Sequence, residues 1–174
     1  MDETRSHIIQ DLVTQLENDD WLVRYNAAKI LGDIDAEEAI QQLLEKLGRE
    51  DNRDVRRRIV QSLVKIDLNI VIPDLIWIMK SDSSMMVRYT AARALGRMGA
   101  TEAIPHIMER IAKEKNNESI FWFNLALARL EEDKKGQGIR AIEEMKKKKL
   151  LTVKQELEFS KFLKELKQRK KRKK

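Results

Sequence analysis

Apolar side chains recur at helical spacing along most of this chain. One set returns at the i, i+4, i+8, i+11 spacing of a single helix face, at Val23, Ala27, Leu31 and Ile34. A second set follows the i, i+3, i+4, i+7 spacing of another helix face, at Ile40, Leu43, Leu44 and Leu47. The pattern predicts two amphipathic helices joined by a few residues, each with one apolar face to bury.

The same pair of helices is repeated along the chain with a period of 32 residues. Its clearest marker is the dipeptide at Val23-Arg24, Val55-Arg56 and Val87-Arg88. Corresponding positions of successive copies, called columns below, hold similar side chains: Leu31, Leu63, Leu95 and Leu127 in one column, and Ile40, Ile72 and Ile104 in another. A fixed period of this length is typical of stacked helical units, none of which can bury its apolar face alone.

Two stretches, VRYNAAKILGDIDAEEAI and VRYTAARALGRMGATEAIPHI, resemble HEAT repeats, and more closely the HEAT-like repeats of phycobilisome lyases. The resemblance extends over roughly residues 18–131. Copy two departs from it at Val64, which stands in the column of Gly32 and Gly96, and copy four keeps only a few matching positions. The resemblance implies an all-α fold, a right-handed α-solenoid (superhelix) of helical hairpins. It implies little about function, because one fold serves many functions.

The columns also predict how the chain is divided. We expect a HEAT-like solenoid over 1–145, with a half-repeat at 1–18 and repeats at 19–49, 50–81, 82–114 and, in degenerate form, 115–145. Acidic residues before the first helices suit helix starts, and Pro73 and Pro105 fall in first turns, where the missing N–H costs least. Another apolar stripe predicts a C-terminal capping helix over 146–168, followed by a basic tail at 169–174. Phe121, Trp122 and Phe123 cannot share one helix face, so we expect an additional packing partner for that helix.

Composition excludes several classes of site and of protein. The 174 residues contain no Cys, which excludes disulfides, thiolate zinc sites and cysteine nucleophiles. No apolar run reaches the ~18 residues of a membrane-spanning helix, and the polar start does not resemble a signal peptide. We therefore expect a cytoplasmic protein without a membrane span.

Positive charge is concentrated at the C-terminal end. The whole chain has a net charge of +6, but residues 145–174 hold 14 Lys or Arg against 3 Asp or Glu, so the remainder is acidic. Such an arm can bind a phosphate backbone or another anionic surface by counterion release, or it can be a solvated terminus. The candidate polyanion-binding residues are Lys146, Lys147, Lys148, Lys149, Arg169, Lys170, Lys171, Arg172, Lys173 and Lys174.

Three arginines form a ladder, because Arg24, Arg56 and Arg88 occupy one column. They could bind phosphates. We favour a structural ladder, since a residue repeated with the fold is most simply a stacking residue, and Arg–carboxylate pairs are often bidentate. In the repeat family that the chain resembles, such an arginine usually pairs with acidic residues at neighbouring helix starts, which implies Asp19, Asp51, Asp54 and Asp82 as partners here.

Catalytic and metal-binding patterns are sparse. His106 and Glu109 lie on one side of a helix and could supply two metal ligands, which is too few for a site. The resemblance extends to deoxyhypusine hydroxylase, bilin lyases and DNA alkylation glycosylases, but there is no His-Glu dipeptide, and the chain has no Gly-rich phosphate loop, nucleophile elbow or HExxH motif. We therefore expect no catalytic residues, no metal and no cofactor.

The second helices of such stacks line the concave face in the proteins that the chain resembles. Their outward positions give the candidate partner-binding residues Gln41, Gln42, Glu45, Asp74, Trp77, Ile78, His106, Glu109 and Arg110. Trp77 stands where other copies have Glu45 and Glu109. An exposed Trp beside Ile78 would form a binding hot spot, whereas a Trp folded over the groove would be structural.

The sequence thus predicts a non-catalytic protein–protein interaction module that binds another protein through its concave face. Two alternatives stay open. One is a nucleic-acid- or ribosome-associated factor that uses the basic tail, and the other is an enzyme related to HEAT-like lyases or glycosylases.

Overall fold

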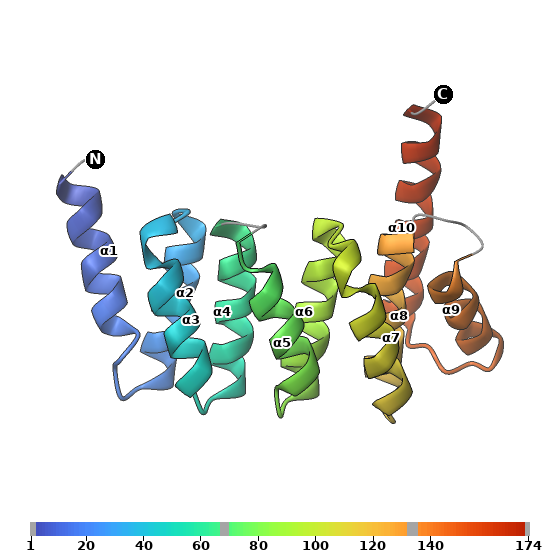
Figure 1. The fold of residues 1–174 in the computed structure, drawn as a ribbon, viewed down its shortest axis with the longest axis horizontal. Helices are drawn as coiled ribbons and strands as arrows, with labels where there is room; N and C mark the ends of the chain where they lie inside the picture. Colours follow the sequence, from blue (N-terminus) through green and yellow to red (C-terminus); the bar gives the residue numbers. More distant parts are fainter. Residues whose placement is uncertain (1–2, 67–69, 132–135, 173–174) are drawn as a thin grey trace. The chain divides into compact units, whose positions relative to one another are not determined.

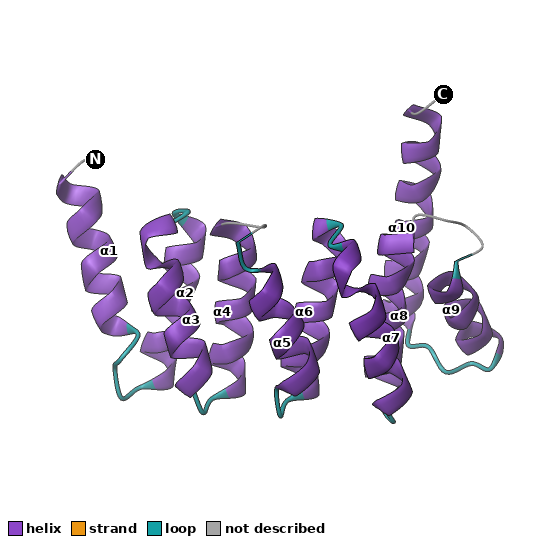
Figure 2. Cartoon of the chain, viewed as in Figure 1, coloured by secondary structure: helices purple, strands orange, loops and turns teal. Residues whose placement is uncertain are grey.

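The computed structural model describes residues 3–66, 70–131 and 136–172, and every regular element in these ranges is helical (Figure 2). The α-helices are α1 (Glu3–Gln15), α2 (Trp21–Asp33), α3 (Ile40–Arg49), α4 (Arg53–Ile66), α5 (Ile72–Ser81), α6 (Met85–Met98), α7 (Ile104–Lys113), α8 (Asn117–Glu131), α9 (Gln137–Lys147) and α10 (Val153–Arg172). Two short 3-10 helices, η1 (Glu37–Ala39) and η2 (Thr101–Ala103), precede α3 and α7. The all-α fold expected from the sequence is confirmed.

The chain forms two compact units, which are described separately. Unit 1 comprises Met1–Ala94 and unit 2 comprises Leu95–Lys174, so the division falls within α6. In unit 1, α2 packs against α1 and α4, and α3 packs against α4. In unit 2, α8 packs against α7, α9 and α10. Within the described residues, each unit is a stack of helices (Figure 1).

Local sequence explains where the helices begin. The Asp20 carboxylate accepts a hydrogen bond from the Leu22 amide at 2.9 Å, and Asn52 and Asn116 accept in the same way before α4 and α8. These side chains satisfy amide groups that the first turn of a helix leaves without an intrahelical acceptor. Proline lies at the start of α5 and α7, as the columns predicted.

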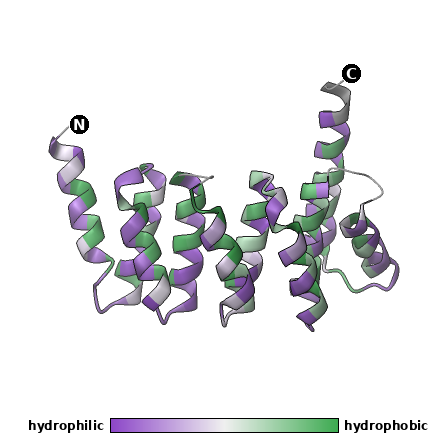
Figure 3. Cartoon of the chain, in the orientation of Figure 1, coloured by the Kyte–Doolittle hydropathy of each residue, from purple (hydrophilic) through white to green (hydrophobic). Residues whose placement is uncertain are grey.

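One layer of the core of unit 1 lies between the first helices of successive repeats. Ala27, Ala28 and Leu31 of α2 are fully buried, as are Ile59 and Leu63 of α4. The hydropathy of the helices alternates accordingly between buried apolar and exposed polar positions (Figure 3). Small residues in this layer allow α2 and α4 to approach closely, which explains the paired alanines and the glycine of the repeat.

The N-terminal helix α1 covers one side of α2. Ile9, Leu12 and Leu16 are buried, whereas Ile8, which the columns align with Ile40, is exposed. Ile40, in contrast, is half-buried. Within the half-repeat predicted at 1–18, the buried residues therefore form one narrow apolar stripe.

The core of unit 2 is centred on α8. Phe121, Trp122 and Phe123 are all buried, because α7, α9 and α10 together cover several sides of this helix. The additional packing partner expected from the three consecutive aromatics is thus the pair α9 and α10. Gly138 of α9 lies so close to α8 that a Cβ atom would come within 2.4 Å of the Asn124 carbonyl oxygen.

The C-terminal helix begins and ends later than the expected range of 146–168. Lys146 and Lys147 are the last residues of α9, and α10 runs from Val153 to Arg172. Residues 169–172, expected as the start of a tail, continue the helix. Lys173 and Lys174 lie outside the described residues. Lys146 and Lys147 place positive charge in the last turn of α9, where it interacts favourably with the helix dipole.

Candidate partner-binding face

The second helices α3 and α5 carry the outward positions of unit 1. Gln41, Gln42 and Glu45 of α3 are exposed, and the Gln41 amide donates to Glu45 at 3.1 Å. On α5, Asp74 is half-buried. In Figure 1, α3 and α5 both lie in front of the first helices of unit 1, which is the arrangement that makes these columns accessible. This exposed side of α3 and α5 is called the second-helix face below.

Trp77 is the most prominent side chain of the second-helix face. It is 63% exposed, although tryptophan is usually mostly buried in folded proteins. Within the described residues its indole makes no hydrogen bond and no aromatic or cation–π contact; only the Trp77 carbonyl is engaged, by the Ser81 hydroxyl at 2.7 Å. Most of the side chain is therefore exposed to solvent. Its role as a binding hot spot stays a prediction.

Ile78 was expected beside Trp77 on this face, and that expectation is wrong. Ile78 is only 2% exposed. The buried stripe of α5 includes Leu75, Ile78 and Met79, so the position after Trp77 points into unit 1. In copy one the same column holds Lys46, whose stem is also buried while its ammonium group reaches Glu17 at 3.3 Å and Glu50 at 3.5 Å. The column thus tolerates either an apolar residue or a paired cation. Because Lys46 is charged, the sequence did not indicate that this column is buried.

The remaining candidates lie on α7, in unit 2. His106 and Arg110 are half-buried and Glu109 is exposed. Arg110 pairs with Glu114 at 2.7 Å, and Glu109 accepts from Lys113 at 2.6 Å. Among the described residues no group of three or more His, Cys, Asp or Glu side chains is placed to hold a metal ion, so His106 and Glu109 have no further ligands there.

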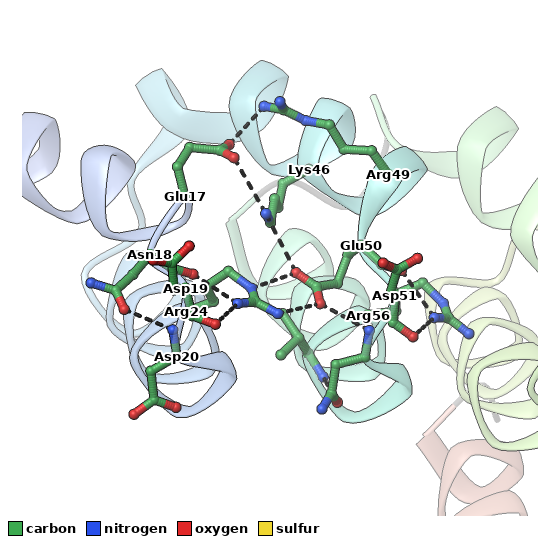
Figure 4. A network of polar contacts seen from close by, with 12 residues as sticks. Glu17, Asn18, Asp19, Asp20, Arg24, Lys46, Arg49, Glu50, Asp51 and Arg56 are labelled. Carbon is green, nitrogen blue, oxygen red and sulfur yellow. Dashed lines mark hydrogen bonds and ion pairs between the residues drawn. The ribbon is translucent and has the colours of Figure 1, made fainter.

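The arginine ladder links successive repeats of unit 1 (Figure 4). Arg24 donates to both oxygens of Glu50, at 2.7 and 2.8 Å, and Arg56 does the same with Asp82 at 2.9 and 3.0 Å. The third nitrogen of each guanidinium donates to two carbonyls of the preceding turn. Arg88 likewise donates to the carbonyls of Asp82 and Ser83. These contacts occupy the donors of Arg24 and Arg56 that a phosphate would need.

The partners of the ladder are only partly the expected ones. Asp82 pairs through its carboxylate, whereas Asp19 and Asp51 contribute their backbone carbonyls, and Asp54 pairs with Arg57 at 3.1 Å. Glu50 was not among the expected partners. It could have been found from the period, because Asn18, Glu50 and Asp82 occupy one column at the turn before each first helix.

The electrostatics of Glu50 follow from this position. Its side chain is almost fully buried, which pushes its pKa upward. The hydrogen bonds from Arg24 and from the Asn52 amide, together with the charges of Arg24 and Lys46, outweigh that effect, so the pKa of Glu50 lies below its usual value. The hydrogen bond with Glu50 in turn raises the pKa of Arg24, and that with Asp82 raises the pKa of Arg56.

The basic residues near the C-terminus differ in their surroundings. Lys146 pairs with Glu156 at 3.3 Å and Lys147 with Glu144 at 2.8 Å, whereas Lys148 and Lys149 form no ion pair with any described residue. Arg169 is exposed near the end of α10. Binding of a nucleic acid or a ribosome by these residues stays a prediction.

One feature of unit 2 has no counterpart in the sequence reasoning. A cavity of about 560 Å³ lies between the first turns of α8 and α10. Its wall includes Trp122 and Leu150 together with Lys115, Lys154 and Glu118. Because it is formed by turns outside the regular repeats, no column indicates it.

Comparison with known proteins identifies the repeats. The chain matches the family model for HEAT repeats over residues 3–64 and again over residues 42–128. Together these ranges contain the whole arginine ladder, the second-helix face and the columns on α7. No curated protein gives a significant match. No helix among the described residues is long and apolar enough to cross a membrane.

Proposed function

Because the chain belongs to the HEAT repeat family, we propose that it is a non-catalytic scaffold that binds another protein through its second helices. HEAT repeats generally mediate protein–protein interaction, and the family is typically non-catalytic. The observation that carries the proposal is the exposure of Trp77 in the middle of α5, on the side away from the core of unit 1.

Trp77 has the properties of an interface anchor. Tryptophan is enriched among the few residues that dominate binding energy, and such residues are surrounded by polar groups that exclude water once the partner is bound. Asp74 lies one helical turn before Trp77, and Glu45 and Gln41 are exposed on α3. An apolar centre with a polar rim is the usual anatomy of an interface.

The rim around Trp77 carries charges of both signs. Glu45 and Asp74 are carboxylates, and Lys80 is exposed on α5 three residues after Trp77. A partner that offers an apolar pocket for the indole, with polar groups around it, would complement this surface. His106, Glu109 and Arg110 occupy the same columns on α7 and are proposed separately as partner-binding residues of unit 2.

The other exposed tryptophan of unit 1 provides a matched control. Trp21 is also exposed, but it lies at the start of α2, a first helix, where its ring meets Tyr25 edge-on at 6.4 Å. The experiment compares the proteins retained by immobilised wild-type chain, Trp77→Ala and Trp21→Ala, identified by mass spectrometry. We expect a protein that is retained by wild type and Trp21→Ala and is lost with Trp77→Ala.

Two further measurements, of binding affinity and of helix content, complete the test. The retained protein should bind purified wild-type chain at least about tenfold more tightly than it binds Trp77→Ala, as expected for an anchor residue. Circular dichroism should show that both variants keep their helices. Equal retention by wild type and Trp77→Ala, with both chains folded, would contradict the proposal.

A further inference from the structure

The turn between α9 and α10, together with the start of α10, presents apolar side chains to solvent. Val153 is 88% exposed, and Leu150 and Leu157 are exposed as well. We call these three residues the aliphatic tip. Val153 and Leu157 are four residues apart and share one side of α10. The opposite side of α10 carries Phe159, Phe162 and Leu166, which are buried in unit 2. The packing of α10 therefore does not depend on the side chains of the tip.

The turn that carries the tip is well defined at both ends. At the end of α9, the Leu150 amide donates to the Met145 carbonyl at 3.0 Å and the Lys149 amide to the Lys146 carbonyl at 3.0 Å, which is a Schellman motif. At the start of α10, the Thr152 amide donates to Gln155 and the Gln155 amide to the Thr152 hydroxyl, which is a capping box. The tip is therefore held in position by two helix caps.

A lysine occupies the one position of this turn that favours glycine. Lys149 has a φ of 56°, in the left-handed region, where a side chain is unfavourable. Glycine or asparagine would suit the Schellman motif better. The turn therefore places a positively charged side chain directly before Leu150, in a conformation that favours glycine.

Lysines outnumber carboxylates near the tip. All three carboxylates of α10 are paired within unit 2, Glu156 with Lys146, Glu158 with Lys161 and Glu165 with Arg129. Among the described residues, no ion pair involves the exposed lysines Lys148, Lys149 and Lys154, although the charge of Lys148 acts on Glu144. The cavity that Leu150 and Lys154 line adds Lys115, accompanied by Glu118. The surroundings of the tip are thus clearly cationic.

We propose that the aliphatic tip and the lysines around it dock the protein reversibly on an anionic lipid membrane. Aliphatic side chains ringed by lysines suit the boundary between acyl chains and negatively charged headgroups. Three aliphatic residues are too few for stable insertion alone, so binding requires anionic lipid as a second signal. This interaction is independent of the second-helix face of unit 1.

Two other kinds of partner fit the tip less well. Protein interfaces are enriched in aromatic residues and Arg and depleted in Lys, whereas the tip has no aromatic residue and its cations are lysines. A nucleic acid would gain affinity from the lysines, but Leu150, Val153 and Leu157 offer neither base stacking nor a phosphate contact. Charge complementarity together with aliphatic exposure therefore favours the anionic bilayer.

The test measures sedimentation of the full chain with vesicles. The vesicles are pure phosphatidylcholine, or phosphatidylcholine with roughly one third phosphatidylserine, which provides the negative surface potential. The variants are Val153→Ser/Leu157→Ser and, as a control, Leu22→Ser, which replaces a leucine of unit 1 whose exposure of 48% is close to the 54% of Leu157. A duplex RNA is tested in parallel by fluorescence anisotropy.

We expect binding to the anionic vesicles only, lost at about 1 M salt, where the Debye length is about 3 Å. Val153→Ser/Leu157→Ser should weaken binding at least about tenfold, because both changes remove apolar surface that the membrane would bury, whereas Leu22→Ser should bind like wild type. Equal vesicle binding by wild type and the double variant would overturn the proposal, because charge alone would then suffice. The absence of vesicle binding, with or without RNA binding, would also overturn it.

Discussion

Arg24 and Glu50 form a bidentate ion pair that joins the first repeat of unit 1 to the turn before the next. Their nitrogen–oxygen distances are 2.7 and 2.8 Å, and both side chains are largely shielded from solvent. Glu50 also accepts from the Asn52 amide and approaches Lys46, so one carboxylate connects α2, α3 and the start of α4 (Figure 4). The pair between Arg56 and Asp82 repeats the arrangement.

Glu50→Gln should destabilise unit 1 strongly. The substitution leaves the shielded Arg24 guanidinium, and partly Lys46, without the opposite charge that compensates them. Removing one partner of a buried pair costs about 3 kcal/mol or more. The measurement is urea denaturation. Glu17→Gln is the control, because Glu17 is half exposed, and its pairs with Lys46 and Arg49 should contribute less than about 1 kcal/mol. Equal losses for the two variants would contradict the importance assigned to Glu50.

The same pair predicts how stability depends on pH. Because the pKa of Glu50 is lowered in the folded chain, its contribution is complete above the usual glutamate pKa of about 4.3 and is lost as pH falls through the lower, folded value. The difference in unfolding free energy between wild type and Glu50→Gln should therefore be largest near neutral pH and should shrink in acid. Urea denaturation of both proteins across this range measures it. A difference that does not change with pH would exclude ionised Glu50 as its source.

Gly32→Ala should destabilise the packing of α2 on α4. A Cβ atom at Gly32 would lie 2.6 Å from the Cβ of Ser62, closer than two carbon atoms can approach. Forcing the helices apart should cost about 1–3 kcal/mol, as for other overpacked cores.

Gly48→Ala is the matched control for that substitution. Gly48 lies within α3, and a Cβ atom there would meet nothing within 4 Å. Because alanine favours helix more than glycine does, this variant should be more stable by about 0.5–1 kcal/mol. Thermal denaturation should show shifts of opposite sign. Stabilisation by both variants would mean that α2 and α4 are not in close contact at Gly32.

Lys149→Gly should stabilise the chain, although it removes a lysine near the tip. Glycine adopts the φ of 56° without steric cost, so the gain should be about 1 kcal/mol. Lys148→Gly should have the opposite effect, because Lys148 has a φ of −78° and gains nothing from the freedom of glycine. Chemical denaturation of the two variants compares them directly. Destabilisation by Lys149→Gly would show that the left-handed conformation is not strained.

Much of the fold could be predicted from the repeat alone. The helices, their pairing and the columns of buried apolar residues follow from a 32-residue period combined with helical spacing, since each apolar stripe must meet its equivalent in the next copy. The exposure of Trp77 was one of two alternatives that the sequence left open. The burial of Ile78 was not predicted, because its column also contains Lys46. The charge of Lys46 indicates a surface position, although its aliphatic stem is buried in unit 1 and its ammonium group is paired.

The sequence by itself determined the architecture of the repeats, because a periodic pattern of apolar residues allows few ways of burying them all. The tertiary structure alone decided which carboxylate pairs with Arg24, which sides of α8 are covered and that the tip at Val153 stays in solvent. These features depend on contacts between residues that no period relates. At the C-terminal end, where the repeat fades, only the packing of α9 and α10 on α8 determines which side chains are buried and which remain exposed.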